Sequence, residues 1–259
     1  MLRKRIIFSL IYSDEYFMQS RNFRLQKVGN LNWLEKNYEF GKIAFSLDEL
    51  IVLNASKNQK CIQKFATTIS KLVKDVFIPI AAGGGIRSFE DAELLFKNGA
   101  DKIILNSILY ENPNLVKRLV KHFGSQSVVA SVDYRTIKNI REVYINDGRI
   151  KIEKSMEDYI QDLIKLDVGE LYLNSIDKDG TGFGYDFDTI HNIVDTIKLP
   201  LIISGGAGNE FHLIQGLDIE GVSAVATANL FNFVGNGLPN ARVKILESGL
   251  NIANWNVNN

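Results

Sequence analysis

Short runs of apolar, β-favouring residues recur along the chain and are separated by longer amphipathic segments. The near-continuous apolar character of these runs is typical of parallel strands that are covered on both faces. Between two of them, Ser88 followed by Asp91 predicts the start of a helix, and Gly99 predicts its end. We therefore expect eight strands alternating with helices, at Arg5–Ile11, Leu50–Asn54, Val76–Ala81, Lys102–Asn106, Val128–Asp133, Glu170–Asn174, Leu199–Ser204 and Val222–Thr227.

An internal repeat distinguishes between the two folds that this pattern allows, an open doubly wound sheet and a closed barrel. The segment Pro79–Gly84 recurs as Pro200–Gly205, displaced by 121 residues. Two copies of a four-strand unit build a closed ring of eight strands, whereas an open sheet has no reason to be halved in this way. We expect an α/β fold, a single (β/α)8 TIM barrel, over residues 1–250, followed by a polar tail, expected to be frayed, over residues 251–259.

Composition excludes several classes of function. Among 259 residues, 30 Lys and Arg balance 30 Asp and Glu, so the chain lacks the basic excess that is typical of nucleic-acid binders. No apolar stretch approaches the ~20 residues that span a membrane. The lone Cys61 excludes a disulfide framework and a cysteine metal cluster, and it favours a reducing cytoplasm. We expect no metal and no cofactor, and we interpret the three histidines, His122, His191 and His212, as structural.

Glycine-rich segments follow the third and seventh expected strands, and small polar residues follow the fourth and eighth. Carboxyl ends of barrel strands carry active sites, and glycine lets backbone N–H groups approach an oxyanion closely. These glycines are also suited to tight turns, but their repetition favours two phosphate-binding cups on opposite sides of the mouth. The residues predicted to bind phosphate are Gly84, Gly85, Asn106 and Ser107 in the first cup, and Gly205, Gly206, Ala228 and Asn229 in the second.

Two acids stand at strand ends on the same rim. Asp133 closes the fifth expected strand, and Asp179 lies just beyond the sixth. Carboxylates between two phosphate cups are suited to general acid and base work. The alternatives are that Asp133 caps a helix and that Asp179, with Asp177 and Gly180, belongs to a turn.

Four charged residues open or immediately precede strands at the opposite end of the expected barrel, and these are Arg5, Glu49, Lys102 and Glu170. Buried charge is costly unless it is paired, so side chains that point inward must pair with one another. Such a ring is either a structural plug or a polar gate through the barrel axis; the remaining alternative is four exposed charges.

Together these residues resemble the cyclase subunit of imidazole glycerol phosphate synthase, over nearly the whole chain up to about residue 250. The segments that carry the resemblance are Lys4–Ile7, Phe77–Ile80, Gly83–Arg87, Gly99–Lys102, Phe123–Gln126, Ser175–Thr181, Gly184–Asp186 and Ser204–Gly208.

The resemblance implies a partner and a reaction in histidine biosynthesis. A glutaminase subunit would dock at the N-terminal face of the barrel and release ammonia, which would pass the charged ring. At the rim, ammonia would react with a bis-phosphorylated ribulosyl aminoimidazole carboxamide nucleotide to give imidazole glycerol phosphate and aminoimidazole carboxamide ribotide. The two cups would hold the two phosphates of this substrate. The family's acid at the end of the fifth strand matches Asp133, and its acid after the sixth strand matches Asp179.

The chain departs from this family at several positions. Where the family has an Asp at the end of the first strand, this chain has Ile11, and where it has a mobile Lys-Gly, this chain has Gln19–Ser20. Asn54 replaces the acid after the second strand, and Ile152–Glu153 replaces a Thr-Gly in the fifth loop. An isoleucine carries no proton, and losing one member of an acid–base pair commonly costs at least ~10²-fold in rate. We therefore expect impaired cyclisation.

This pattern of losses is similar to that of divergent paralogues linked to lipopolysaccharide and other surface-polysaccharide sugars. The alternative function is accordingly a non-cyclising, ammonia-channelling partner of a sugar amidotransferase that makes an acetamidino sugar. An isomerase of the same superfamily fits less well, because it too needs an acid near the end of the first strand and has no use for the charged ring.

Overall fold

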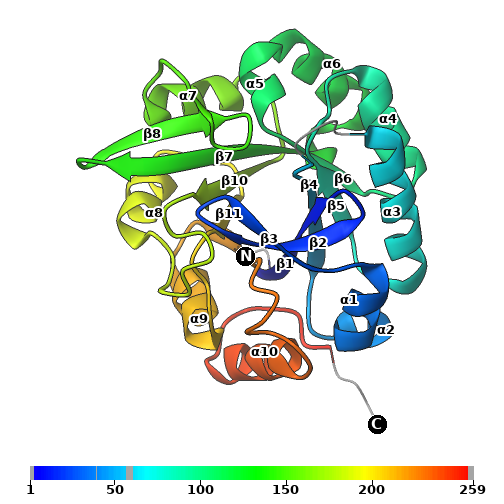
Figure 1. Ribbon diagram of the computed structural model, residues 1–259. Helices are drawn as coiled ribbons and strands as arrows, with labels where there is room; N and C mark the ends of the chain where they lie inside the picture. Colours follow the sequence, from blue (N-terminus) through cyan, green and yellow to red (C-terminus); the bar gives the residue numbers. More distant parts are fainter. Residues whose placement is uncertain (1–2, 39, 57–60, 256–259) are drawn as a thin grey trace.

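The strands close into a ring in this computed structural model, which describes residues 3–38, 40–56 and 61–255. Within these residues, eight parallel strands each pair with the next, and the eighth pairs back with the first. Figure 1 shows the helices arranged around this ring. In order, the strands are β1 (Arg5–Ser13), β4 (Glu49–Asn54), β5 (Ile80–Gly83), β6 (Lys102–Leu105), β7 (Val128–Ile137), β10 (Glu170–Ser175), β11 (Leu201–Ser204) and β12 (Val222–Thr227). The expected (β/α)8 barrel is confirmed.

Amphipathic helices cover the outside of the ring with their apolar faces inward. Helix α4 begins as predicted: Ser88 and Asp91 form a reciprocal capping box, and Gly99 follows its end with a φ of +96°. The helices are α1 (Leu31–Tyr38), α2 (Phe40–Ile43), α3 (Ile62–Asp75), α4 (Phe89–Lys97), α5 (Ser107–Glu111), α6 (Pro113–Phe123), the 3-10 helix η1 (Ser125–Ser127), α7 (Met156–Ile164), α8 (Phe187–Val194), α9 (Glu210–Asp218) and α10 (Gly237–Glu247).

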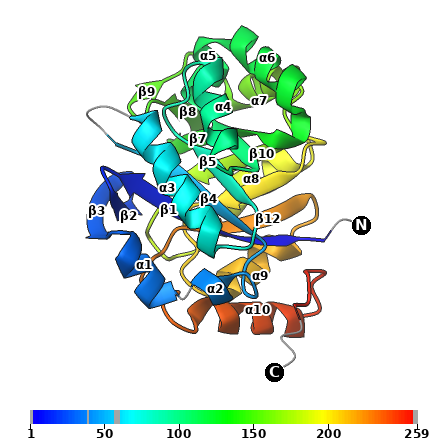
Figure 2. The same ribbon diagram turned by 90° about the vertical axis from the view of Figure 1, so that its right-hand side faces the viewer.

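Two antiparallel hairpins, which the hydrophobic pattern did not predict, extend the ring at its carboxyl end. Strands β2 (Tyr16–Arg21) and β3 (Arg24–Gly29) follow β1, while β8 (Ile140–Ile145) and β9 (Ile150–Lys151) follow β7. Figure 2 shows the β2–β3 hairpin at the end of the barrel opposite the N-terminus. The hairpins thus lie at the mouth, the end at which barrels of this fold carry their active sites.

The third strand begins later than the expected Val76–Ala81. Val76 instead ends helix α3, and Phe77, with 78% of its surface exposed, belongs to the connection. Pro79 has no N–H to donate to a strand ladder, so pairing starts at Ile80.

The half-barrel repeat is visible in the backbone beneath the two glycine segments. Gly84 has a φ of +90°, and a Cβ there would lie 2.2 Å from the carbonyl oxygen of Asn54. Gly205, 121 residues later, has a φ of +93°, and its Cβ would lie 2.5 Å from the carbonyl oxygen of Ser175. Only glycine combines this conformation with so close an approach. The same turn is therefore built twice, over the ends of β4 and β10.

Alternate residues of each strand point into the ring, so one strand places side chains at successive depths. On β1, Arg5 lies at the amino end, Ile7 belongs to an apolar interior layer, and Ile11 borders the mouth. The buried interior layer consists of Ile7, Ile51, Ala81, Ile104, Val129, Tyr172, Ile202, Ala224 and Ala226. This layer separates the amino end of the barrel from its mouth.

The segment after residue 250 packs against the amino end of the barrel. The N–H of Lys4 donates to the carbonyl oxygen of Asn251 at 2.8 Å, and Ile252 and Ala253 are buried. Buried Arg242 binds Asp48 at 2.9 Å and also donates to Ala253. The expectation of a frayed tail is wrong for residues 251–255, and residues 256–259 lie outside the described part of the chain. The division of the chain at residue 250 stays a prediction.

Candidate active site

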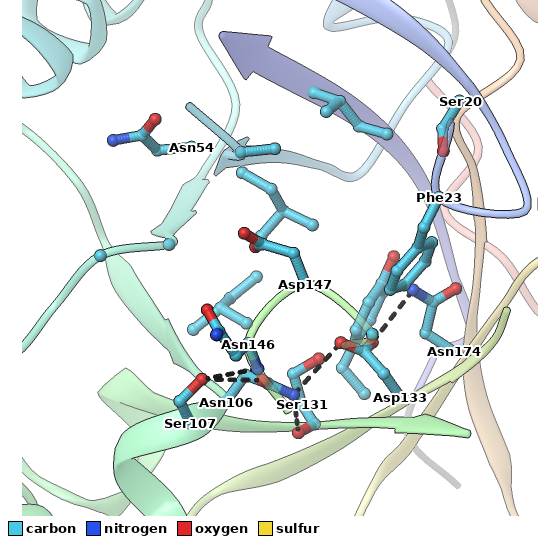
Figure 3. A pocket seen from close by; sticks show the side chains of 18 of the residues that line it. Ser20, Phe23, Asn54, Asn106, Ser107, Ser131, Asp133, Asn146, Asp147 and Asn174 are labelled. Atoms are coloured by element: carbon cyan, nitrogen blue, oxygen red, sulfur yellow. Dashed lines mark hydrogen bonds between the residues drawn. The ribbon is translucent and has the colours of Figure 1, made fainter. Parts of the chain in front are cut away.

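A cavity of about 480 Å³ opens at the carboxyl ends of the barrel strands. Its lining comes from both hairpins and from strand ends around the ring, and Figure 3 shows it from close by. The predicted site residues that border it are Gly84, Gly85, Asn106, Ser107, Asp133, Asp179 and Ala228. Gly205, Gly206, Asn229 and again Ala228 surround a smaller void beside it.

The first cup, formed by Gly84, Gly85, Asn106 and Ser107, is open to this cavity. Ser107 Oγ accepts the backbone N–H of Asn146 at 3.0 Å, which ties the β8–β9 turn to the cup. The turn carries Asp147 over the cavity (Figure 3). The hairpin therefore forms a wall of the first cup.

Asp133 lies in β7 and faces the cavity with 8% of its surface exposed. Its carboxylate accepts the side-chain amide of Asn106 at 3.2 Å and that of Asn174 at 3.1 Å (Figure 3). These donors come from the neighbouring strand ends rather than from a helix terminus, so the capping alternative does not describe Asp133. The two amides stabilise the charged carboxylate and fix its direction. A catalytic role for Asp133 stays a prediction.

Ile11 borders the cavity on β1, the first strand of the ring. Because β1 and β7 are the first and fifth of eight strands, Ile11 and Asp133 lie on opposite sides of the mouth. An aliphatic side chain therefore occupies the position from which a second acid would face Asp133.

Asp179 is buried beneath the β2–β3 hairpin. Its Oδ2 accepts the hydroxyl of Ser20 at 2.5 Å and the backbone N–H of Phe23 at 3.0 Å. Burial raises the pKa of Asp179 above its ordinary value, although these two donors work in the opposite direction. The carboxylate thus connects the hairpin to the loop after β10, a contact between residues far apart in sequence.

The second cup, formed by Gly205, Gly206, Ala228 and Asn229, surrounds a void of about 20 Å³. Gln19 on β2 borders the same void, and its Oε1 accepts the backbone N–H of Leu230 at 2.9 Å. The backbone N–H of Gly208 donates to Nδ1 of His212 at 3.1 Å, so His212 stabilises the glycine loop. The structure brings the predicted residues of this cup together, but the β2–β3 hairpin covers them.

The four residues of the charged ring meet across the amino-terminal opening of the barrel. Arg5 lies 2.6 Å from Glu49 and 2.8 Å from Glu170, and Lys102 lies 2.9 Å from each of the two carboxylates. Burial opposes the charge of Glu170, but Arg5 and Lys102 outweigh it and hold the pKa of that carboxyl below its ordinary value. Among the described residues, Oε1 of Glu49 has no hydrogen-bond partner. The side chains are inward and mutually paired, and a gating role stays a prediction.

Sequence reasoning missed several cavity residues that the hairpins contribute. Four arginines line the cavity: Arg24, Arg135 and Arg149 come from the hairpins, and Arg87 comes from the loop between β5 and α4. An Asp-Gly step at residues 147–148, between alternating apolar residues, is a hairpin signal that would have indicated β8 and β9. For β2 and β3 the charged, polar sequence carries no comparable signal.

The described residues show neither a metal cluster nor a membrane-spanning helix. They contain no group of three His, Cys, Asp or Glu side chains placed to hold a metal ion. Nor does any helix in residues 3–38, 40–56 or 61–255 have the length and apolar character needed to cross a membrane.

Comparison with known proteins identifies relatives along nearly the full chain. The family described as "Histidine biosynthesis protein" matches residues 37–235. "Putative imidazole glycerol phosphate synthase subunit hisF2" of Parasynechococcus marenigrum is 43% identical over 256 residues, covering 98% of this chain and 95% of that relative. "Imidazole glycerol phosphate synthase subunit HisF" is 33% identical over 252 residues in Dictyoglomus turgidum (96% and 98% covered) and 31% over 254 residues in Bacillus cereus (97% and 99%).

Proposed function

Because the chain belongs to the histidine biosynthesis protein family, we propose that it is the ammonia-using, cyclase-type subunit of a glutamine amidotransferase complex. A glutaminase docks at the amino-terminal face of the barrel, and ammonia travels along the barrel axis. A phosphorylated small molecule binds at the mouth and accepts the nitrogen. The complex acts in the cytoplasm, in keeping with the lone cysteine.

The charged ring is the observation that carries this proposal. A structural plug would be served at least as well by apolar side chains, because a buried ion-pair cluster is often no more stabilising than hydrophobic residues of similar volume. Here four charges are retained at the end of the barrel opposite the cavity. Carboxylate oxygens can accept hydrogen bonds from ammonia, and ammonium groups can donate to it. Oε1 of Glu49 is an acceptor that no described residue engages.

The first candidate for the nitrogen acceptor is the bis-phosphorylated ribulosyl aminoimidazole carboxamide nucleotide. Its cyclisation and C–N cleavage would give imidazole glycerol phosphate and aminoimidazole carboxamide ribotide. Asp133, oriented by Asn106 and Asn174, would transfer protons, and Asp179 would be the second acid. Activity would be low, because Ile11 occupies the position across the mouth from Asp133.

The second candidate is a non-cyclising role, in which the barrel channels ammonia to a sugar amidotransferase of surface-polysaccharide biosynthesis. Two observations favour it. Ile11 leaves the mouth without an acid opposite Asp133, and Asp179 is engaged in holding the β2–β3 hairpin.

One assay separates the two candidates. The purified barrel is incubated with the bis-phosphorylated nucleotide and an ammonium salt at high pH, and imidazole glycerol phosphate is measured. Turnover supports the first candidate. Absence of turnover, together with glutamine hydrolysis by a co-expressed glutaminase only when the barrel is added, supports the second. If the barrel neither turns over the nucleotide nor activates the glutaminase, the proposed function is wrong.

A further inference from the structure

The two cups at the mouth offer very different amounts of space. The first cup opens into the cavity of about 480 Å³, whereas the second, of which only Ala228 borders that cavity, surrounds a void of about 20 Å³. A void of that size holds about one water molecule, and a phosphate group is several times larger. The backbone turns beneath the cups are alike, so the difference lies in what covers them.

Gln19 covers the second cup. Its carboxamide oxygen accepts the N–H of Leu230 at 2.9 Å, while the N–H of Asn229 points to the hydroxyl of Thr227 at 3.4 Å. Backbone amides after β12 are the donors that a phosphate in this cup would need. A neutral side-chain oxygen of the protein is already bound to one of them.

The position of Gln19 follows from the anchoring of its hairpin. Ser20 and the N–H of Phe23 bind Asp179, and the N–H of Asn22 donates to the carbonyl oxygen of Asp179 at 3.0 Å. At Gly180 a Cβ would lie 2.0 Å from the carbonyl oxygen of Ser20, so the two backbones meet without room for a side chain. These contacts hold the hairpin, and with it Gln19, over the second cup.

The distribution of charge also separates the cups. The large cavity is lined by four arginines alongside its carboxylates, whereas the described lining of the second void includes Asp179 and neither lysine nor arginine. Lys178 lies beside Gly206 but does not line the void. A dianion entering the second cup would meet the carboxylate of Asp179, and like charges at short range are unfavourable. The lining of the large cavity therefore compensates a phosphate better than the lining of the small void.

From these contrasts we propose that the mouth binds a phosphomonoester through the first cup alone, and that Gln19 excludes phosphate from the second cup. The nitrogen acceptor of the proposed complex is then a molecule with one phosphate group and an uncharged far end. This inference rests on the proposed function only where it calls the ligand the nitrogen acceptor, and it counts against the bis-phosphorylated nucleotide of the first candidate.

Crystals soaked in sodium phosphate test the proposal directly. The unchanged protein should show one phosphate per chain, at Gly84–Gly85, and Gln19→Ala should add a second, at Gly205–Gly206. Gln26→Ala is the matched control, because Gln26 pairs with Gln19 across the hairpin but is exposed and does not border the void. It should keep a single phosphate.

Three results would overturn the proposal: phosphate in the second cup of the unchanged protein, no phosphate in its first cup, or a single phosphate in Gln19→Ala. Melting curves show whether each variant is folded, and Gln19→Lys is a second variant that leaves the backbone propensity of β2 nearly unchanged and should also gain the second phosphate. The proposed function fails separately, in the glutaminase assay, which needs no phosphate site.

Discussion

Replacing Glu49 with Gln removes one negative charge from the charged ring and barely changes the volume of the side chain. The Glu49 side chain is 3% exposed and lies 2.6 Å from Arg5 and 2.9 Å from Lys102. Breaking a buried ion pair by removing one partner costs about 3–5 kcal/mol. Glu170 still compensates part of the two positive charges, and burial, which raises the pKa of Glu49, already opposes its charge. We therefore expect the lower end, about 3 kcal/mol. For a chain of this size that corresponds to a fall in Tm of roughly 6–12 °C.

Differential scanning calorimetry measures this loss against a matched control. Glu93→Gln is the same substitution in an exposed pair, 2.8 Å from Lys97, with side chains 40% and 67% exposed. Such a pair is worth at most about 0.5 kcal/mol, so Tm should stay nearly constant. A fall in Tm for Glu49→Gln no larger than that of the control would refute the electrostatic reasoning.

Removing one positive and one negative charge from the charged ring together tests its proposed role as a gate for ammonia. Glu49→Gln combined with Arg5→Met leaves Lys102 paired with Glu170, so most of the lost stability should return. In a complex with the glutaminase, the same double variant should hydrolyse glutamine while transferring less nitrogen to the acceptor. Unchanged transfer would leave the ring as a structural plug.

Three further changes test the mouth. Under the first candidate, Ile11→Asp should raise ammonia-dependent cyclisation at least about 10²-fold, measured as imidazole glycerol phosphate; no gain would mean that the missing acid is not the reason for low activity. Gly84→Ala should lower the free energy of unfolding in urea by about 2 kcal/mol or more, because the new Cβ would lie 2.2 Å from a backbone oxygen. Gly41→Ala is the control, and it should not destabilise the fold because its Cβ would meet nothing within 4 Å. The raised pKa of Asp179 means that the folded state favours the protonated form of this carboxyl. The stability gained in this way is present at low pH and is lost as pH rises through the pKa of Asp179 in the folded state. Asp179→Asn should therefore gain in Tm relative to the unchanged chain from about pH 4 to about pH 7, and a pH-independent difference would contradict this.

The ring of strands could be predicted because each strand is marked by a short stretch of its own sequence and because the two halves of the chain repeat. Buried parallel strands read as apolar runs, and the 121-residue repeat distinguishes a closed ring from an open sheet. The inward direction of Arg5 was left open, because alternation along a strand does not say which set of side chains points into the ring. The third strand was misplaced because Phe77 is apolar yet exposed, which periodicity alone does not reveal.

The state of the mouth could not be predicted from the sequence, because it depends on contacts between distant residues. Gln19 meets Leu230, and Ser20 meets Asp179, across intervals that no local pattern encodes. The β2–β3 hairpin that makes these contacts has only three consecutive apolar residues, Tyr16–Met18, and is otherwise mainly polar. Sequence symmetry therefore indicated two equivalent cups, while the tertiary structure makes them unequal.

The hydrogen bond between Lys4 and Asn251 brings the segment before the first barrel strand and the segment after α10 to one place. The two segments that flank the barrel along the chain are thus neighbours in space, as the first and last strands of the sheet are. A gene that fused these ends and opened the chain near Gly124, between the two halves, would translate the second half first. Every strand would keep its neighbours, so the order of synthesis is separable from the architecture.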